Sequence, residues 1–209
     1  MNAPTANGIR LPRIGVLGIQ GDYAAHAAAL REAGAEAVDV RKPEDLEGVD
    51  GLILPGGEST TMLRFLDRHG LFEVLKEFCA SRPVFGTCAG AILLAKEVRN
   101  PAQRSLGALN ATVERNAYGR QIDSSIETGP TTLSGGPMEM VFIRAPRIVK
   151  IGDGVETLAM RDGFPVLVRQ GNIVAATFHP ELSPDRRVHR FFVEIVRRLR
   201  RENPATNGD

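Results

Sequence analysis

The residue in this chain best suited to covalent chemistry is Cys88, within the G-x-C-x-G sequence Gly86-Thr-Cys-Ala-Gly90. An apolar run, Pro83–Gly86, precedes it and a helical pattern follows it, which is the order of a nucleophile elbow. In such a sharp turn the central side chain projects above the sheet, and small neighbours two residues away let strand and helix approach closely. The positive end of the helix then faces the thiolate, the reactive form of cysteine. The alternative is a small buried cysteine in a tight turn.

A base for this nucleophile is expected at His179, which follows an apolar run and begins His-Pro-Glu181. In extended backbone, side chains two residues apart point to the same side of the chain. Glu181 can then accept the proton of one ring nitrogen while the other nitrogen faces Cys88, as in a catalytic triad. The alternative is a histidine that merely ends a strand before a turn. The remaining histidines are expected in two helices, at the surface or partly buried, and at a helix C-terminus: His26, His189 and His69.

A second turn, Pro55-Gly-Gly-Glu-Ser59, follows the short apolar run Gly51–Leu54. Open parallel sheets bind ligands beyond the carboxyl ends of their strands, which is where this turn would lie. The N–H groups of Gly57 and Ala89 are therefore candidates for an oxyanion hole. Taken alone, two glycines after a strand are equally typical of a plain tight turn.

These residues need a scaffold, and the first half of the chain alternates short β-branched runs with helical patterns. That alternation is typical of βαβ units around a mostly parallel sheet. Strands are expected at Arg13–Gly18, Glu36–Val40, Gly51–Leu54 and Pro83–Gly86, and helices at Tyr23–Ala33, from Glu58 to His69, at Leu71–Ala80 and at Ala91–Glu97.

From about Met138 the pattern changes to strands without intervening helices. They are expected at Met140–Arg144, Val155–Met160, Val166–Arg169 and Ile173–Phe178, with hairpin turns between the last three. Apolar residues at helical spacing predict a closing helix over Asp185–Arg201. The predicted fold is α/β: a flavodoxin-like, open, mostly parallel sheet flanked by helices, with an antiparallel extension. We expect a disordered extension at residues 1–12, a single domain at 13–201 and a flexible tail at 202–209.

Composition narrows the choice of partners. The 209 residues include 26 Lys+Arg and 25 Asp+Glu, a net charge of +1, so no overall field attracts nucleic acid or an anionic membrane. No apolar run approaches the ~20 residues that span a bilayer, and residues 1–12, which lack an apolar run, do not resemble a secretory signal. Two cysteines without metal-ligand spacing predict neither a disulfide framework nor a metal site, and favour a reducing, cytoplasmic setting. Nucleotide-binding glycine motifs are missing from the sequence, so no nucleotide cofactor is expected.

The chain resembles the class I (triad) glutamine amidotransferases in three motifs together: Pro55-Gly-Gly-Glu-Ser59, Gly86-Thr-Cys-Ala-Gly90 and Phe178-His-Pro-Glu181. The resemblance is closer to one family within that class, the glutaminase subunits of pyridoxal 5'-phosphate synthases (PdxT/SNO). It extends from about Arg13 to Leu199, and Glu114-Arg-Asn-x-x-Gly-Arg-Gln121 is specific to that family. Further blocks of similarity are Val16–Gly21, Leu52–Thr61, Phe142–Pro146 and Thr177–Leu182.

The resemblance implies that Cys88 attacks the side-chain amide of L-glutamine, that His179 is the acid/base and that Glu181 orients it. The reaction would release glutamate and ammonia through a γ-glutamyl thioester, without a metal or organic cofactor. By the same resemblance the glutamine-contacting positions are Gly57, Glu58, Ser59, Arg115, Ile143 and Arg144. A guanidinium suits the α-carboxylate of glutamine and a carboxylate suits its α-ammonium, but the sequence does not assign the two ends.

The resemblance also implies a partner, a (β/α)₈-barrel synthase subunit that receives the ammonia and builds pyridoxal 5'-phosphate. We expect docking to complete the oxyanion hole, and Gly18-Ile-Gln-Gly21 to be a contact loop. Two alternatives remain at this stage. One is a glutaminase domain that serves a different acceptor, and the other is a catalytically silent binding module on the same flavodoxin-like scaffold.

Overall fold

A seven-stranded sheet forms the centre of the protein, in the order β10-β11-β12-β4-β3-β1-β2. We describe residues 10–19, 23–116 and 124–202 of a computed structural model. Five neighbouring strands are parallel. If these five are numbered 1 to 5 in chain order, their order across the sheet is 2-1-3-4-5, which is the order of flavodoxin-like sheets. The predicted fold class is confirmed. These strands are β1 (Arg13–Leu17), β2 (Glu36–Val40), β3 (Gly51–Leu54), β4 (Val84–Thr87) and β12 (Ile173–Ala176).

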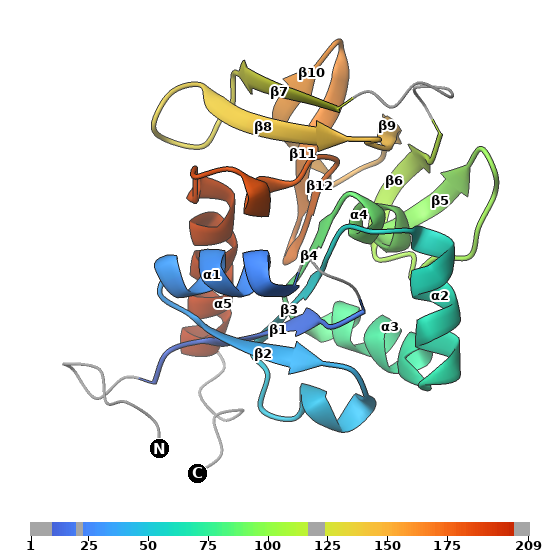
Figure 1. Ribbon diagram of the computed structural model, residues 1–209, viewed down its shortest axis with the longest axis vertical. Coiled ribbons are helices and arrows are strands. Elements are labelled where there is room, and N and C mark those ends of the chain that lie inside the picture. The colour runs from blue at the N-terminus through green and yellow to red at the C-terminus, as the bar shows by residue number, and fades with distance from the viewer. Residues whose placement is uncertain (1–9, 20–22, 117–123, 203–209) are drawn as a thin grey trace.

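Helices cover both faces of this sheet (Figure 1). One face carries α1 (Tyr23–Glu32) and α5 (Arg187–Glu202), and the other carries α2 (Ser59–Arg68), α3 (Leu71–Ser81) and α4 (Ala89–Leu94). Successive side chains of a strand point to opposite faces, so Leu52 and Leu54 pack with α2 to α4 while Ile53 packs with α1 and α5. Because helices cover both faces, the central strands are apolar without alternation.

The predicted antiparallel extension lies at one edge of the sheet. β11 (Phe164–Gln170) pairs antiparallel with both β12 and β10 (Glu156–Arg161). The two hairpin turns fall where the sequence places them, because Gly163 and Gly171 adopt positive φ values there. In Figure 1 this extension lies at the top of the view, near β7 and β8.

Two smaller sheets were not predicted. One has the order β5-β6-β9, formed by Ala95–Arg99, Leu109–Glu114 and Arg147–Ile151. The other pairs β7 (Ser124–Gly129) with β8 (Met138–Ile143). Short 3₁₀ helices, η1 (Pro43–Leu46) and η2 (Pro180–Leu182), complete the elements.

The predicted helix Ala91–Glu97 is wrong in its second half. α4 ends at Leu94, and Ala95 begins β5, whose pairing partner β6 starts at Leu109. Ala95 and Val98 are buried and the two residues between them are exposed. This three-residue spacing of buried positions also fits a helix, so it did not identify the strand. Because the strand partner lies well downstream, the local pattern could not reveal the pairing.

Several boundaries also shift. β8 ends at Ile143 because Arg144 leaves the strand with a φ of 45°, and β12 ends at Ala176 rather than at Phe178. Residues 1–9 of the expected extension and 203–209 of the expected tail lie outside the described residues. At the inner ends of those segments, the carbonyl of Pro12 accepts the N–H of Glu36 at 2.9 Å and Glu202 belongs to α5. No helix in the described ranges is long and apolar enough to cross a membrane.

At the junction of β4 with α4, next to Cys88, helix and strands approach so closely that two positions have no room for a side chain. A Cβ atom on Gly90 would lie 1.9 Å from the carbonyl oxygen of Leu54, and a Cβ on Gly86 would lie 2.6 Å from the carbonyl of Gly90. Backbone atoms at such distances cannot move aside independently. The glycines on either side of Cys88 are therefore required by steric fit.

We expect Gly90→Ala to lower the free energy of unfolding by about 3 kcal/mol or more, because the new methyl group overlaps the backbone of β3. Chemical denaturation measures the change. Gly163→Ala is the matched control: its Cβ would meet no atom within 4 Å, so only backbone strain of about 1 kcal/mol opposes it. Equal stability of the two variants would contradict this packing argument.

Candidate active site

Cys88 occupies the turn between β4 and α4 in a conformation that non-glycine residues rarely adopt, with φ 48° and ψ −103°. Its N–H donates to the carbonyl of Ala176 at 2.8 Å, which joins the turn to the end of β12. The residue is 7% exposed. The strain is typical of a functional turn, and it directs the thiol above the carboxyl ends of the strands.

His179 and Glu181 lie together, but not in the extended backbone that was expected, because His179 precedes η2 and Glu181 lies within that 3₁₀ helix. The His179 Nδ1 to Glu181 Oε1 distance is 2.7 Å, and both side chains are buried. The N–H of His179 donates to the carbonyl of Val141 at 2.8 Å. This hydrogen bond to β8 fixes the backbone of His179 after the end of β12. Glu181 lies in η2 behind the ring rather than in the cavity.

Two opposed effects act on the imidazole of His179. Burial by itself lowers its pKa, but the hydrogen bonds and charges of Cys88 and Glu181 outweigh burial and raise the pKa to about 10. The imidazolium form is therefore favoured between the sulfur and the carboxylate. A protonated imidazole beside the sulfur suits an acid/base that gives its proton to a leaving group.

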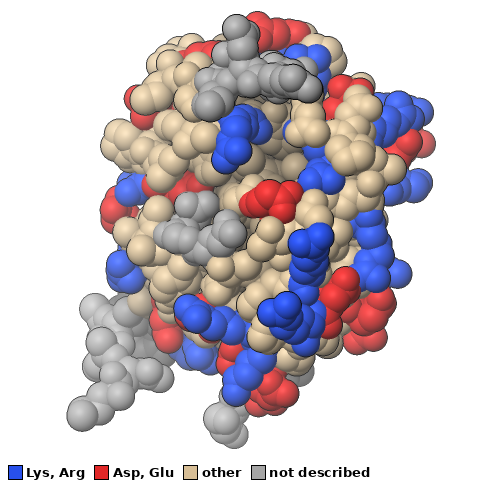
Figure 2. Space-filling view, turned by 45° about the vertical axis from the view of Figure 1, so that its right-hand side comes forward, with Lys and Arg blue, Asp and Glu red and all other residues tan. Residues whose placement is uncertain are grey.

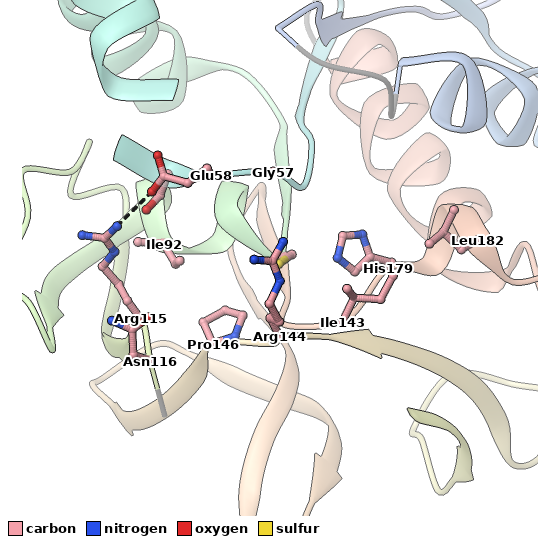
Figure 3. A pocket seen from close by; sticks show the side chains of 12 residues that line it. Gly57, Glu58, Ile92, Arg115, Asn116, Ile143, Arg144, Pro146, His179 and Leu182 are labelled. Carbon is pink, nitrogen blue, oxygen red and sulfur yellow. Dashed lines mark hydrogen bonds and ion pairs between the residues drawn. The ribbon is translucent and has the colours of Figure 1, made fainter. Parts of the chain in front are cut away.

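A cavity of about 390 Å³ opens above Cys88. It is large enough for a small metabolite, and it combines both signs of charge with apolar walls. Of the residues named from the sequence, eight line it: Gly57, Glu58, Ser59, Cys88, Arg115, Ile143, Arg144 and His179. They come from the ends of β3, β4, β6, β8 and β12 and from the start of α2. Figure 3 shows the side chains of Glu58, Arg115, Arg144 and His179 around this cavity.

Four lining residues were missed by the sequence reasoning: Ile92, Asn116, Pro146 and Leu182. Three of them lie inside the blocks that carry the resemblance, so the signal was present in the sequence. Ile92 follows Cys88 by one helical turn, which places its side chain on the same side of α4. Ala89, 1% exposed, does not line the cavity.

Glu58 and Arg115 form an ion pair at one end of the cavity (Figure 3), with 3.2 Å between Arg115 Nη2 and Glu58 Oε1. Glu58 also caps α2 by accepting the N–H groups of Thr60 and Thr61. Partial burial favours the protonated acid, but these hydrogen bonds lower the pKa of Glu58 to about 2. The carboxylate therefore stays ionised. Ser59 is committed elsewhere, since its hydroxyl donates to Gln103 Oε1 at 2.9 Å.

Arg144 brings a second guanidinium to the cavity, and it comes from the turn after β8. Its side chain is exposed and points into the cavity between Arg115 and His179 (Figure 3). Within the described ranges, no ion pair or hydrogen bond involves its guanidinium. The cavity thus offers an ionised carboxylate and an available guanidinium on the same side as the thiol.

The expectation that His26 and His189 are at the surface or partly buried is wrong. Both are 0% exposed, because α1 packs against α5 and η2 and encloses them. Burial lowers the pKa of both rings, to about 3 for His189, so both are neutral. In the part of the chain that is described, no group of three metal-ligating side chains comes together. On the face seen in Figure 2, acidic and basic side chains are interspersed.

Comparisons with known proteins agree with one another. A model of the SNO glutamine amidotransferase family matches residues 16–198. A Koribacter versatilis protein named pyridoxal 5'-phosphate synthase subunit PdxT is 60% identical over 185 residues, 88% of this chain and 96% of that protein. A Thermotoga maritima protein of the same name is 55% identical over 188 residues, 88% of this chain and 100% of that protein.

The solved structures agree as well. A crystal structure described as a glutamine amidotransferase superimposes with a TM-score of 0.81 at 49% identity and covers 88% of this chain and 98% of its own. The likeness extends over almost the whole chain. The matched segments include every residue of the cavity.

The charged form of His179 should stabilise the fold over a defined pH range. Its pKa rises from 6.5 to about 10 on folding, so the contribution is complete below pH 6.5 and is lost as the pH rises through 10. We expect the free energy of unfolding of the wild type to exceed that of His179→Gln by an amount that shrinks between these values. Urea unfolding across the range measures it. In Cys88→Ala the pH dependence should be weaker, and a wild-type advantage that grows with pH would contradict the assignment.

Proposed function

The chain belongs to the SNO glutamine amidotransferase family, and from that premise we propose that it hydrolyses L-glutamine to L-glutamate and ammonia as the glutaminase subunit of a pyridoxal 5'-phosphate synthase. The observation that supports this most directly is the placement of Cys88 against the buried His179–Glu181 pair. A cavity with an ionised carboxylate and an available guanidinium lies above that sulfur. Those groups match the two charged ends of an amino acid.

In the first half-reaction the Cys88 thiolate attacks the side-chain amide carbon of glutamine, and the carbonyl electron pair moves to oxygen. The N–H groups of Gly57 and Ala89 are the proposed donors to that oxyanion. When the tetrahedral intermediate collapses, the imidazolium of His179 gives its proton to the departing nitrogen. Ammonia leaves and a γ-glutamyl thioester remains on Cys88.

In the second half-reaction neutral His179 accepts a proton from water, whose oxygen attacks the thioester carbon. Collapse breaks the C–S bond, releases glutamate and restores the thiolate beside the imidazolium. Glu181 keeps the ring oriented through Nδ1 in both halves, so that Nε2 faces the reacting atoms. Every proton moves between the substrate, water and His179, so these steps need no metal or organic cofactor.

We assign the ends of the substrate from the electrostatics of the cavity. Glu58 is ionised and held by Arg115, which suits it to accept from the α-ammonium group. The guanidinium of Arg144 suits the α-carboxylate, since planar donors bind carboxylates in pairs. Ile143 and Gly57 line the cavity between the charged groups and the thiol.

The relatives are named as subunits, which supports a complex with a synthase subunit. We propose that this partner is a (β/α)₈ barrel, that it receives the ammonia, and that docking completes the oxyanion hole. Of the proposed contact loop Gly18-Ile-Gln-Gly21, the last two residues lie outside the described residues. Catalysis by Cys88 requires a free thiol, which a cytoplasmic location would maintain.

We expect Cys88→Ala to reduce glutamate release in the complex by about 10⁴-fold or more, because the covalent route is removed. The measurement is glutamate formation by wild type and variant, each with and without the barrel subunit from the same source. The wild type should need the partner for full activity. If glutamate appears in none of the mixtures, a non-catalytic binding module becomes the better account, and equal activity with and without the partner would rule out completion of the site by docking.

We expect Arg144→Gln to raise the KM for glutamine by roughly 10- to 100-fold, since a charge-assisted contact of about 1.5–3 kcal/mol is lost. Steady-state kinetics of the complex measure it. Arg68→Gln removes the same charge from the exposed end of α2 outside the cavity and should leave KM unchanged. An unaltered KM in Arg144→Gln would move the α-carboxylate to another group.

A further inference from the structure

A row of buried polar side chains continues behind the triad, away from the cavity. His26 of α1 lies between His189 of α5 and Glu181 of η2. Nδ1 of His26 is 3.1 Å from Nε2 of His189, and Nε2 of His26 is 3.5 Å from Oε2 of Glu181. All three side chains are fully buried.

One oxygen of the Glu181 carboxylate has no hydrogen-bond donor within the triad. Oε1 accepts from His179, whereas Oε2 is buried and makes no hydrogen bond with the described residues. A buried carboxylate oxygen without a donor is costly, and the carboxylate can rotate to relieve it. Nε2 of His26 faces this oxygen just beyond hydrogen-bond length. Active-site contacts of this kind often shorten when substrate binds.

The two histidines are neutral, so each ring carries one N–H. The carboxylate of Glu181 favours the tautomers that direct these N–H groups toward it. If Nδ1 of His26 held the proton, the lone pair of Nε2 would face the charged Oε2. With the proton on Nε2, His26 donates toward Glu181, and His189 Nε2–H donates to His26 Nδ1. This arrangement alone points both N–H groups toward the carboxylate.

Other groups around the row are compatible with this arrangement. The Thr87 hydroxyl oxygen of β4 lies 3.4 Å from His26 Nε2, and with the proton on Nε2 it accepts from the same N–H that faces Glu181. Arg186 donates to the backbone carbonyl of Glu181 and pairs with Glu32 of α1, so its charge is directed elsewhere. Phe85 packs edge-on against His189. These contacts hold the two rings in place.

We propose that His26, held by His189, is a positioning residue that orients the Glu181 carboxylate toward His179. The proposal rests on the function proposed above. His26 supplies the donor for Oε2, which leaves Oε1 directed at His179 Nδ1 throughout the reaction. It touches neither substrate nor sulfur, and it acts through Glu181 alone.

The test compares three variants in the complex with the barrel subunit. His26→Leu removes the donor, His26→Gln keeps an N–H donor on a side chain of similar reach, and Leu30→Val perturbs the same buried side of α1 without touching Glu181. We expect His26→Leu to lower kcat by about 10- to 100-fold, the usual cost of losing an orienting partner, with KM within about twofold. His26→Gln should restore most of kcat, and Leu30→Val should lose stability only.

A second readout does not depend on turnover. The proton that His179 shares with Glu181 should give a downfield NMR resonance in the wild type, in His26→Gln and in Leu30→Val, and exchange broadening should remove it in folded His26→Leu. If His26→Leu does not fold, His26→Met fills the site without a donor and takes its place.

A wild-type kcat or an unchanged resonance in the donor-free variant overturns the proposal. A folded His26→Gln whose kcat is no higher than that of the donor-free variant also overturns it. If the wild type releases no glutamate while the resonance responds as expected, the glutaminase function fails and the positioning role stands.

Discussion

The contact that the rest of the site depends on is the one between Gly90 and the carbonyl of Leu54. It leaves no room for a side chain at the start of α4, and it brings the helix directly onto β3 and β4. At this close approach Cys88 takes up a φ of 48° between the two elements. The direction of the thiol is thus a result of how closely a helix packs on a sheet.

The same junction places the partner of the thiol. Because the Cys88 N–H donates to Ala176, the turn is tied to the last residue of β12, and His179 follows three residues later. The N–H of His179 is in turn bound by β8, a strand of a different sheet. Nucleophile and base therefore follow neighbouring parallel strands, while the separate sheet of β7 and β8 supports the base.

Charge and burial interact differently in the cavity and behind it. In front, the exposed end of Glu58 is kept ionised by the first turn of α2, and it pairs with Arg115. Behind, Glu181 is enclosed, and an enclosed carboxylate must find its donors within the protein. The helices α1 and α5 meet this need with neutral histidines, so covering one face of the sheet also provides polar groups to the triad.

Much of this protein could be read from its sequence because the relevant signals are local. The spacing Gly86-x-Cys88-x-Gly90 marks a sharp turn, and His179 and Glu181 are close in sequence, two residues apart. Short apolar runs mark most of the parallel strands. Pairing between distant segments was decided only by the tertiary structure. Ala95 belongs to a strand because β5 pairs with β6, and His26 is buried because α5 and η2 pack against α1. Neither event leaves a local pattern, since the free energy of each comes from surfaces that meet only when the chain is folded.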